Sequence, residues 1–356
     1  MSVFAQPDFA SHEQVVFAAD AATGLKAILA IHDTRRGPAL GGCRYWAYGD
    51  EDAAIRDALR LSHGMTYKAA VADLPLGGGK SVILAPPGGD PGAKPDGLMA
   101  AMGRAVDRLG GRYIIAEDVG TSPADMAEIA RETGHVVGLA PEDGGRGDPS
   151  PVTARGIFAG LRAAVAYRTG KDDLTGLTVA VQGLGHVGRA LCGLLHEAGA
   201  GLVVTDLREA AVAEAVESLG ARAADPHAIL SEPVDVLAPC ALGAVIDDTS
   251  VARLRAGIVA GAANNQLAEA RHGLALRERG ILYAPDYVLN AGGLIHVAAD
   301  HFRHDADWVA GRLDGIAATL TEIFRRADRD GVATSAAADR LAEDRLREAD
   351  AAALAA

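Results

Sequence analysis

Hydrophobic and polar positions alternate with the period of a β-strand near the start of the chain, and with the period of a helix further on. Residues 25–31 alternate as in a half-buried strand, and the turn residues 22–24 join them to the apolar segment 12–20, which predicts a hairpin. The apolar spacing between about residues 50 and 70 predicts a helix. Residues 75–84 then combine a glycine-rich turn with an apolar strand, so we expect an α/β domain here.

A different pattern begins after residue 150, where short apolar segments and helical stretches follow one another repeatedly. Strands that alternate with helices at this spacing predict a parallel sheet with helices on both faces. The clearest interruption of the apolar pattern is the stretch 141–152, which is rich in glycine, proline and charge. We therefore expect one domain at residues 1–148 and a second at residues 149–331, with a hinge between them.

The C-terminal tail, residues 332–356, is rich in helix-forming residues. Helical spacing places four apolar residues of this tail on one face: Ala342, Leu346, Ala349 and Ala353. A helix with one apolar stripe buries that stripe against another surface. We therefore expect the tail to pack back on the first domain.

Composition and charge narrow the range of partners. The 356 residues fit about two domains at ~150 residues each, and 49% hydrophobic residues suffice for a buried core. The net charge of −13 opposes binding to nucleic acid or to an anionic membrane surface. Cys43, Cys192 and Cys240 lie far apart and form no CxxC pair, which is typical of a reducing compartment. Because neither a signal peptide nor a membrane span is visible, we expect a cytoplasmic protein.

A nucleotide-binding motif follows the first predicted strand of the second domain. Residues 178–182 read as a strand, GLGHVG follows as GxGxxG, and a helix comes next. The glycines permit a tight turn, close approach of a pyrophosphate and close packing of helix on strand, while the helix N-terminus faces the anion. The loop residues are Gly183, Leu184, Gly185, His186, Val187 and Gly188. We take His186 as a variable position of the motif, with no catalytic role.

The next strand, residues 202–205, ends in Asp206, at the separation of about 20 residues expected for a carboxylate that binds ribose hydroxyls. A carboxylate at this position repels a 2′-phosphate, which favours NAD over NADP. Arg208 follows two residues later and is either a phosphate ligand or a solvated residue at the start of a helix. We favour the second interpretation of Arg208.

A nicotinamide enzyme also needs groups that hold the substrate and transfer protons. Lys68 ends the helix predicted at residues 50–70, and Lys80 follows the glycine triplet at residues 77–79. Asp118 ends a strand predicted at residues 112–119. Shortly after it, SPAD at residues 122–125 has the N-cap serine, proline and early carboxylate of a helix start.

The chain resembles the glutamate/leucine/valine/phenylalanine dehydrogenase family over about residues 12–345, and most closely its leucine and valine members. The motifs that carry the resemblance, in chain order, are GPALGGCR, GMTYKAA, LPLGGGKSVI, AEDVGTSPADM, SPVTARG, VQGLGHVG, APCALGAVI, GAANNQL and LYAPDYVLNAGG. The resemblance implies NAD-linked, reversible oxidative deamination of an L-amino acid to a 2-oxo acid and ammonia. It also implies an N-terminal α/β substrate domain, a Rossmann domain, and a cleft between them that closes during turnover.

The resemblance assigns roles to the lysines and the aspartate. Lys68 matches the lysine that holds the substrate carboxylate, with the backbone at Gly41 and Gly42 beside it. Lys80 matches the catalytic lysine that activates the attacking water and stabilises the oxyanion, and Asp118 matches the residue that exchanges protons with the amino group. A lysine acts as a base near neutral pH only if burial or a neighbouring cation lowers its pKa, so we predict a lowered pKa for Lys80.

Further matches line the cofactor and the substrate. Thr153, Cys240 and Ala241 match positions that line the cofactor. Asn264 and Asn290 match asparagines near the nicotinamide and the substrate, although either could simply form a turn. The histidine- and aspartate-rich segment 300–307 could hold a metal, but the family needs none, and we predict no metal site.

The predicted substrate pocket is apolar. Glutamate-specific members carry a lysine where this chain has Leu40, and a buried charge without that partner is penalised. The residues that match the pocket are Leu40, Met65, Ala116, Leu294 and Val297. Leu294 is bulkier than the alanine expected in a phenylalanine-type pocket, so leucine, valine and isoleucine are the first candidates.

Other functions remain open from the sequence. The alternatives are a phenylalanine dehydrogenase and, outside this class, a 2-hydroxy-acid dehydrogenase or a non-catalytic NAD-binding regulator. Members of the family form large homo-oligomers, and the N-terminal hairpin and C-terminal tail are candidate contacts. We expect an amino acid and ammonia as partners, a homo-oligomer, and neither nucleic acid nor membrane.

Overall fold

The computed structural model describes residues 2–88 and 93–355 of the chain. Its internal contacts divide the chain into two compact units. The first unit contains residues 1–148 together with the later segments 297–304 and 342–356. The second unit contains residues 149–296 and 305–341. The division after residue 148 falls inside the stretch rich in glycine and proline.

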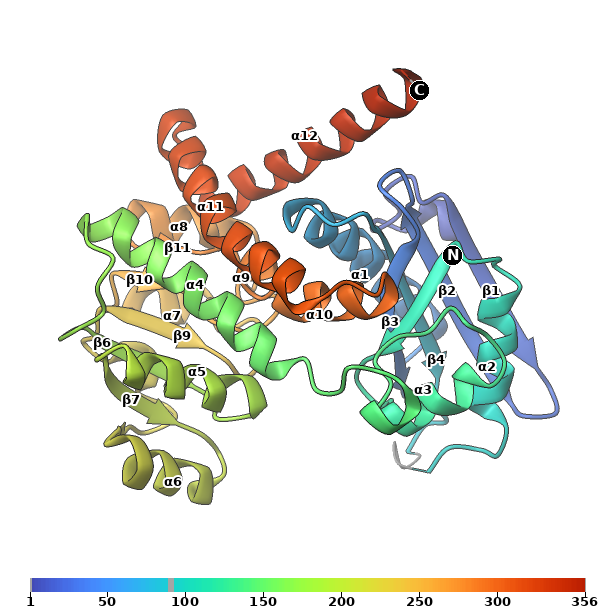
Figure 1. Ribbon diagram of the computed structural model, residues 1–356, viewed down its shortest axis with the longest axis horizontal. Helices are drawn as coiled ribbons and strands as arrows, with labels where there is room; N and C mark the ends of the chain where they lie inside the picture. Colours follow the sequence, from blue (N-terminus) through green and yellow to red (C-terminus); the bar gives the residue numbers. More distant parts are fainter. Residues whose placement is uncertain (1, 89–92, 356) are drawn as a thin grey trace. The chain divides into compact units, whose positions relative to one another are not determined.

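The first unit is built on a five-stranded mixed sheet (Figure 1). Its strands are β1 (Gln14–Asp20), β2 (Leu25–Asp33), β3 (Ala39–Trp46), β4 (Gly77–Leu84) and β5 (Tyr113–Glu117). Their order in the sheet is β1-β2-β4-β3-β5. β1 and β2 form the predicted hairpin and β2 is antiparallel to β4, whereas β3 runs parallel to both β4 and β5. Short 3-10 helices lie at Val3–Ala5 and Pro141–Asp143.

Helices α1 (Glu51–Val71), α2 (Leu98–Asp107) and α3 (Pro123–Ala130) complete this unit. The predicted start of α3 is confirmed, because Ser122 and Asp125 form a reciprocal capping box. Leu29 of β2 packs in one core with residues of α2 and α3, while Ile28 packs in a second core with residues of α1. Most of β2 is therefore buried on both faces rather than half-buried, because Ile28 and Ala30, which lie between the alternating positions, are apolar too.

The glycine triplet before Lys80 lies inside β4, so the predicted glycine-rich turn is wrong. A Cβ atom at Gly78 would lie 2.1 Å from the backbone nitrogen of Thr66 on α1. A Cβ atom at Gly79 would lie 2.6 Å from the ring of Tyr113 on β5. Glycine is required here because neighbouring elements approach the strand closely, which local turn propensity cannot reveal.

The second unit contains a six-stranded sheet in which each strand runs parallel to its neighbours. Its strands are β6 (Thr178–Gln182), β7 (Gly201–Thr205), β8 (Arg222–Ala223), β9 (Val236–Pro239), β10 (Ile258–Val259) and β11 (Leu282–Tyr283). The order β11-β10-β9-β6-β7-β8 is that of the doubly wound dinucleotide-binding fold, and the strand order reverses between β6 and β9. The predicted fold class is confirmed.

Helices alternate with the strands of the second unit in sequence, as the pattern predicted, and the first helix comes before β6. They are α4 (Ser150–Thr169), α5 (His186–Glu197), α6 (Glu209–Leu219), α7 (Asp248–Arg253), α8 (Arg271–Glu278), α9 (Asp286–Leu289) and α11 (Ala306–Asp330), with a 3-10 turn at Ile229–Ser231. Helices α10 (Gly292–His301) and α12 (Thr334–Ala355) each contribute residues to both units.

The C-terminal part of α12 belongs to the first unit. The Arg345 guanidinium donates hydrogen bonds of 3.1 and 2.6 Å to the carbonyl oxygens of Ala70 and Val71, at the end of α1. Leu346 of the predicted apolar stripe is buried, whereas the side chain of Ala353 lies outside the described residues. The last turn of α1 is thus capped by a side chain some 275 positions later in the sequence.

A cluster of histidine rings lies between β2, which carries His32, and α1, which carries His63. His32 contacts the rings of His12 and His63 at centroid distances of 4.8 and 4.6 Å. Its Nε2 lies 3.0 Å from the carbonyl oxygen of Ala10, and its Nδ1 lies 2.8 Å from the hydroxyl of Thr66. A neutral ring satisfies both contacts, because Nε2–H donates to the carbonyl and Nδ1 accepts from the hydroxyl. Burial, with His63 and His12 nearby, lowers the pKa of His32 to about 4.

This cluster predicts a loss of stability in acid. Between pH 6.5, the ordinary pKa of His32, and about 4, its pKa in the folded state, the unfolded chain binds more protons. Stability is therefore fully present above pH 6.5 and falls as the pH drops through this window, by about 3 kcal/mol from His32 alone. Urea unfolding at fixed protein concentration should show a smaller pH slope for His32→Gln than for the unchanged protein. Exposed His227→Gln is the control, and equal slopes for His32→Gln and the unchanged protein would refute the prediction.

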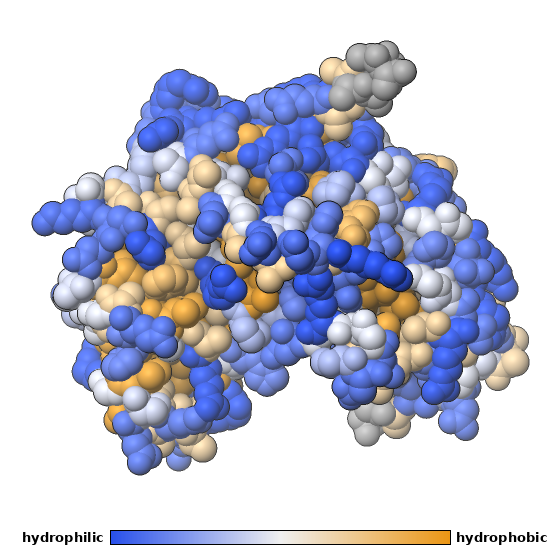
Figure 2. Space-filling model, viewed as in Figure 1, coloured by the Kyte–Doolittle hydropathy of each residue, from blue (hydrophilic) through white to orange (hydrophobic). Residues whose placement is uncertain are grey.

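Hydrophilic residues cover most of the face shown in Figure 2, with apolar patches between them. Among the described residues, no helix is both long enough and apolar enough to span a bilayer. The most exposed large apolar side chains are Phe4, Leu207 and Leu242. Two of these three, Leu207 and Leu242, follow the ends of β7 and β9, at the edge of the sheet that carries the glycine loop.

Candidate active site and nucleotide site

A buried lysine and a carboxylate form an ion pair in the first unit. Lys80 lies on β4, in the middle of the sheet, and only 8% of its side chain is exposed. Its Nζ donates a short hydrogen bond to Oδ2 of Asp118, in the loop that follows β5. The backbone nitrogen of Asp118 in turn donates to the Thr121 hydroxyl, 2.9 Å away. The structure thus brings together two of the three predicted catalytic residues.

Two glycines of β3 make room for this pair. A Cβ atom at Gly42 would lie 2.6 Å from the Cβ of Asp118. A Cβ atom at Gly41 would lie 1.7 Å from the carbonyl oxygen of Gly79. Larger residues at either position would therefore displace Asp118 or the strand that carries Lys80.

The sheet register places two of the predicted pocket residues on the face of Lys80. Leu40 pairs with Gly78, and Gly42 pairs with Ala116. Side chains alternate between the two faces along a strand, so Leu40 and Ala116 share the face of Lys80. Both side chains are buried, with exposures of 2% and 8%. An apolar surface therefore adjoins the buried pair.

Helix α1 packs over the same face, since Thr66 lies against Gly78. Met65 and Lys68 lie on either side of Thr66 in the last turns of α1, and both are partly exposed. The first unit therefore carries Lys68, Lys80 and Asp118 on one face of a sheet and on the helix that covers it.

Burial and charge oppose each other at the pair. Burial lowers the pKa of Lys80 below its ordinary value, although the carboxylate of Asp118 acts in the other direction. The direction of this shift is the one predicted from the sequence. Burial by itself would raise the pKa of Asp118, but Lys80 and Arg44 outweigh that effect and hold the pKa below its ordinary value. A lysine of lowered pKa beside an ionised carboxylate is suited to proton transfer near neutral pH.

Arg44 is a further member of this cluster that the sequence interpretation did not single out. Its Nε donates to Oδ2 of Asp118 at 2.8 Å, and its Nη1 donates to Oδ2 of Asp57 on α1, also at 2.8 Å. The sequence did contain a signal for Arg44. It is an arginine inside a buried strand, and the alternation of side chains places it on the same face of β3 as Leu40 and Gly42.

The glycine loop of the second unit starts at the end of β6. A Cβ atom at Gly183 would lie 2.8 Å from the Cβ of Ala241, and one at Gly188 would lie 2.0 Å from the carbonyl oxygen of Gly183. A Cβ at Gly185 would meet no described atom within 4 Å. The first and last glycines thus permit close packing, and the middle one leaves open space at the N-cap of α5. This is the arrangement that a bound pyrophosphate requires.

Asp206 fixes this loop to the end of β7. Its Oδ2 accepts a hydrogen bond of 2.6 Å from the backbone N–H of Leu184, and its Oδ1 accepts one of 2.8 Å from that of Arg208. Burial would raise the pKa of Asp206, but these two N–H groups and the Arg208 side chain keep it below the ordinary value. Arg208 is exposed at the start of α6, as we favoured, but its Nη2 also donates to the carbonyl oxygen of Leu184, 2.8 Å away.

Two asparagines predicted near the nicotinamide meet in the second unit. Nδ2 of Asn290 donates to Oδ1 of Asn264 at 2.7 Å and to the carbonyl oxygen of Ala262 at 2.9 Å. Asn264 and Asn265 form a turn in this loop, and Asn265 is its left-handed residue, with φ of 51°. The buried Oδ1 of Asn290 has no hydrogen-bond partner among the described residues. A buried acceptor without a donor is available to a ligand.

Three features of the second unit fit a nicotinamide dinucleotide. They are the open space at Gly185, the ionised Asp206 and the unsatisfied acceptor of Asn290. Cys240 and Ala241 follow β9 directly, where the sheet order reverses. Thr153 lies against Gly292 and Gly293 at the start of α10. The predicted cofactor residues are therefore grouped at the carboxyl edge of one sheet or in the loops and helices beside it.

The remaining predicted pocket residues lie on α10. Leu294 is buried and Val297 is partly exposed, three positions further along the helix. Leu294 groups with the second unit and Val297 with the first. The predicted substrate residues are thus divided between the two units, with Leu40, Met65 and Ala116 in the first.

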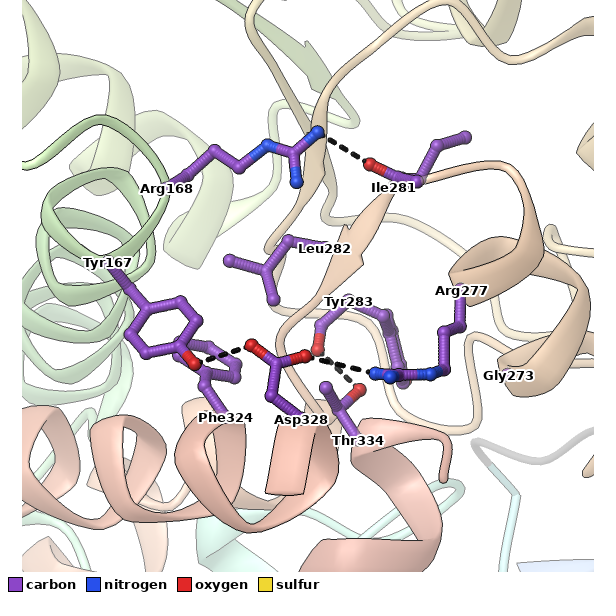
Figure 3. A pocket seen from close by; sticks show the side chains of 11 residues that line it. Tyr167, Arg168, Gly273, Arg277, Ile281, Leu282, Tyr283, Phe324, Asp328 and Thr334 are labelled. Atoms are coloured by element: carbon purple, nitrogen blue, oxygen red, sulfur yellow. Dashed lines mark hydrogen bonds and ion pairs between the residues drawn. The ribbon is translucent and has the colours of Figure 1, made fainter. Parts of the chain in front are cut away.

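A separate hollow of about 390 Å³ lies on the second unit (Figure 3). Asp328 accepts hydrogen bonds from the Tyr167 hydroxyl at 2.6 Å and from the Arg277 guanidinium at 3.0 Å. Thr334 donates to the carbonyl oxygen of Tyr283 at 2.7 Å. Because these polar groups bind one another, the hollow does not have the features of a catalytic site. Among the described residues, no three His, Cys, Asp or Glu side chains are grouped to hold a metal ion.

The second unit has a dinucleotide fold, and the first unit has a buried lysine–carboxylate pair. Together they define a dehydrogenase that works with a nicotinamide cofactor. Two models of one family match the chain: "Glu/Leu/Phe/Val dehydrogenase, dimerisation domain" at residues 12–135, and "Glutamate/Leucine/Phenylalanine/Valine dehydrogenase" at residues 203–353. The chain belongs to this family and is an amino acid dehydrogenase. The resemblance noted in the sequence is confirmed.

Individual relatives support the family over nearly the whole length. Leucine dehydrogenase of Bacillus subtilis (strain 168) is 51% identical over 346 residues, which cover 97% of this chain and 94% of that protein. The crystal structure of L-tryptophan dehydrogenase from Nostoc punctiforme has a TM-score of 0.85 and 45% identity, covering 96% of this chain and 97% of the other. Hetero-hexameric glutamate dehydrogenase from Thermus thermophilus (Leu bound form) has a TM-score of 0.74 and 27% identity, covering 96% and 90%.

Proposed function

We propose that the protein catalyses the NAD-dependent, reversible oxidative deamination of a branched-chain L-amino acid, leucine, valine or isoleucine, to the 2-oxo acid and ammonia. The observation that carries the proposal is the buried Lys80–Asp118 pair beside an apolar wall made by Leu40 and Ala116. The 51% identity to a leucine dehydrogenase supports the same substrate class.

The proposed roles follow from the chemistry of each side chain. Lys68 holds the substrate carboxylate, beside the backbone at Gly41 and Gly42. A nicotinamide cofactor held by the glycine loop and Asp206 would supply the acceptor for the hydride of the α-carbon. Asp118 then exchanges a proton with the amino group, and neutral Lys80 takes a proton from the water that attacks the imino carbon. The adduct is a carbinolamine. As it collapses, Asp118 returns its proton to the amino group, protonated Lys80 stabilises the negative charge that develops on the hydroxyl oxygen, and the hydroxyl proton passes to solvent, which leaves the 2-oxo acid and ammonia.

The two units divide this work in the proposal. Residues 1–148 hold the substrate and transfer protons, and residues 149–331 hold the cofactor. The C-terminal part of the tail, residues 342–356, completes the first unit. Asn264 and Asn290 position the nicotinamide and the substrate.

Substrate preference rests on the apolar pocket. Leu40 is buried and carries no charge to pair with the side chain of glutamate, so a γ-carboxylate is penalised. We also assign Met65, Leu294 and Val297 to substrate binding, and the bulk of Leu294 favours an aliphatic side chain over a large ring. The similarity to an L-tryptophan dehydrogenase makes an aromatic amino acid the second candidate class.

Cofactor preference rests on Asp206, whose ionised carboxylate accepts hydrogen bonds from ribose hydroxyls and repels a 2′-phosphate. NAD is therefore the proposed cofactor, with NADP a poor substitute. Replacing Asp206→Ala should weaken binding of NADH and reduce the preference for NAD over NADP about tenfold, a change of about 1.4 kcal/mol. Fluorescence titration with NADH and NADPH measures both effects, and an unchanged preference would contradict this role.

Oligomerisation and location complete the proposal. We propose a cytoplasmic homo-oligomer. β1 is at the edge of its sheet and exposes Phe17, which suits pairing with another copy. The three cysteines are free and far apart in sequence, as in reducing compartments.

The test is cofactor reduction by the purified protein at alkaline pH. The substrates are L-leucine, L-valine, L-isoleucine, L-phenylalanine, L-tryptophan and L-glutamate, each with NAD and in duplicate with NADP. We expect the fastest turnover on the aliphatic acids with NAD. Faster turnover on an aromatic acid would keep the chemistry and refute the pocket assignment.

Two further outcomes separate the functions outside this class. Turnover of a 2-hydroxy acid with no dependence on ammonia in the reverse direction would indicate a 2-hydroxy-acid dehydrogenase. NADH binding without turnover of any substrate would indicate a regulator. Either result would overturn the proposed reaction.

A further inference from the structure

Arg44 joins two carboxylates that come from different elements. It lies on β3, and its guanidinium reaches Asp118 after β5 through Nε and Asp57 on α1 through Nη1, both at 2.8 Å. Asp57 is itself held at both oxygens. Its Oδ2 also accepts a hydrogen bond of 2.8 Å from the Tyr48 hydroxyl, and its Oδ1 accepts one of 3.2 Å from Arg60.

The guanidinium and Lys80 bind the same oxygen of Asp118, Oδ2. No hydrogen bond to Oδ1 is made by the described residues, so this oxygen is the one left for a ligand. Two cations that bind one oxygen of a carboxylate restrict its orientation and leave its other oxygen free to accept from a ligand.

The cluster is too well enclosed to be an ordinary surface ion pair. The exposed fractions of the Asp57, Asp118 and Arg44 side chains are 15%, 23% and 27%. Exposed ion pairs contribute little to stability, and partly buried pairs bring desolvation costs that apolar residues avoid. An arrangement of this kind is therefore better explained by what it does to Asp118 than by stability.

We propose that Arg44, braced by Asp57, is a positioning residue that keeps Asp118 ionised and oriented while Lys80 gives up its proton. This inference rests on the proposed function, in which Lys80 acts as the base. When Lys80 is neutral, Asp118 would otherwise lose its only counter-ion. The guanidinium cannot release a proton, so it remains a cation beside the carboxylate at every stage of turnover.

The charged and titratable groups around the pair fix the direction of the expected effect. Those that face it or adjoin it are Lys80, Arg44, Asp57, Tyr48, Cys43, Glu117 and Asp118 itself. Burial raises the pKa of the Cys43 thiol to about 12, so it stays neutral in the working range. Loss of the Arg44 charge favours the protonated form of both Asp118 and Lys80, because each then loses a neighbouring positive charge.

The test is the pH profile of kcat/KM for Arg44→Gln with the preferred amino acid. We expect the acidic limb, on which Asp118 must be ionised and Lys80 neutral, to move upward by about one pH unit. A merely structural role would lower activity or the melting temperature and leave this limb in place, and an unmoved limb in a folded variant would overturn the inference. Arg104→Gln is the matched control, because Arg104 in the same unit also bridges two carboxylates, Asp20 and Glu132.

A second variant tests the brace. Asp57→Asn keeps the shape of the side chain and leaves the Arg44 charge in place. We expect kcat to fall about tenfold, with smaller movement of the acidic limb than in Arg44→Gln, because a loosely held guanidinium no longer orients Asp118. If Arg44→Gln does not fold, this variant decides alone, and an unchanged kcat overturns the inference.

Lys80→Ala is measured in parallel, so that the two proposals can fail separately. Turnover that survives in Lys80→Ala overturns the proposed function. Loss of turnover there, together with an unmoved acidic limb in Arg44→Gln, overturns only the role of Arg44.

Discussion

Replacing Lys80→Ala is expected to reduce kcat on the order of 10³-fold while NADH binding stays unchanged. Lys80 is the buried amine nearest to Asp118, and burial lowers its pKa toward the range in which an amine acts as a base. Alanine supplies neither a base for the attacking water nor a cation for the oxyanion. The cofactor residues lie in the other unit, so binding of NADH has no reason to change.

The variant should also fold, because Asp118 keeps the Arg44 guanidinium as its counter-ion. Lys94→Ala is the matched control. Lys94 is another largely buried lysine of the first unit, paired with Asp125 at 3.0 Å. Steady-state kinetics on both variants, with thermal unfolding beside them, check the prediction. If kcat falls by a comparable amount in both variants, the loss is explained by removal of a buried lysine–carboxylate ion pair and not by chemistry at Lys80.

Replacing Gly188→Ala is expected to abolish detectable NADH binding. The added Cβ would lie 2.0 Å from the carbonyl oxygen of Gly183 and 3.2 Å from the Cβ of Cys240, so the loop and α5 must separate. The backbone N–H groups at the start of α5 then no longer converge on a pyrophosphate. A loss of at least a hundredfold in affinity, about 2.8 kcal/mol, is the expected magnitude.

Gly193→Ala provides the comparison in the same helix. A Cβ at Gly193 would meet no described atom within 4 Å, and alanine favours helix over glycine by up to about 1 kcal/mol. This variant should bind NADH normally and unfold at the same or a higher temperature. Fluorescence titration and thermal unfolding measure both. Normal NADH binding by Gly188→Ala would mean that the loop does not hold the pyrophosphate.

Much of the fold could be predicted because local and long-range requirements agree. The hairpin, the helix start at Ser122 and the strand–loop–helix at Gly183 each have a signal confined to a few neighbouring residues. Alternating strands and helices leave few arrangements apart from a parallel sheet with short crossovers. The strand order around β6 follows the rule for sheets that carry such a loop.

The features that could not be predicted depend on contacts between distant segments. Gly77–Gly79 read as a turn, because nothing in the local sequence reveals that α1 and Tyr113 approach the strand. Arg44 had no visible partner until folding brought Asp57 and Asp118 to it. Asn264 and Asn290 are 26 positions apart, and only the structure shows that their side chains meet. Lys80 and Asp118 could be identified from the sequence, whereas Arg44 and Asp57, which hold Asp118 in place, could not.

The contribution of α12 to the first unit affects the order in which a new chain matures. Residues 342–356 are translated after the whole of the second unit, yet they belong to the first. Arg345 is needed to cap the final carbonyls of α1, the helix that bears Lys68. As the chain leaves the ribosome, the dinucleotide unit therefore has nearly all of its residues before the amino-acid unit does, contrary to the usual N-terminal-first order of multidomain proteins. The face of the first unit that bears Lys68 is then completed only after the whole of the second unit has been synthesised.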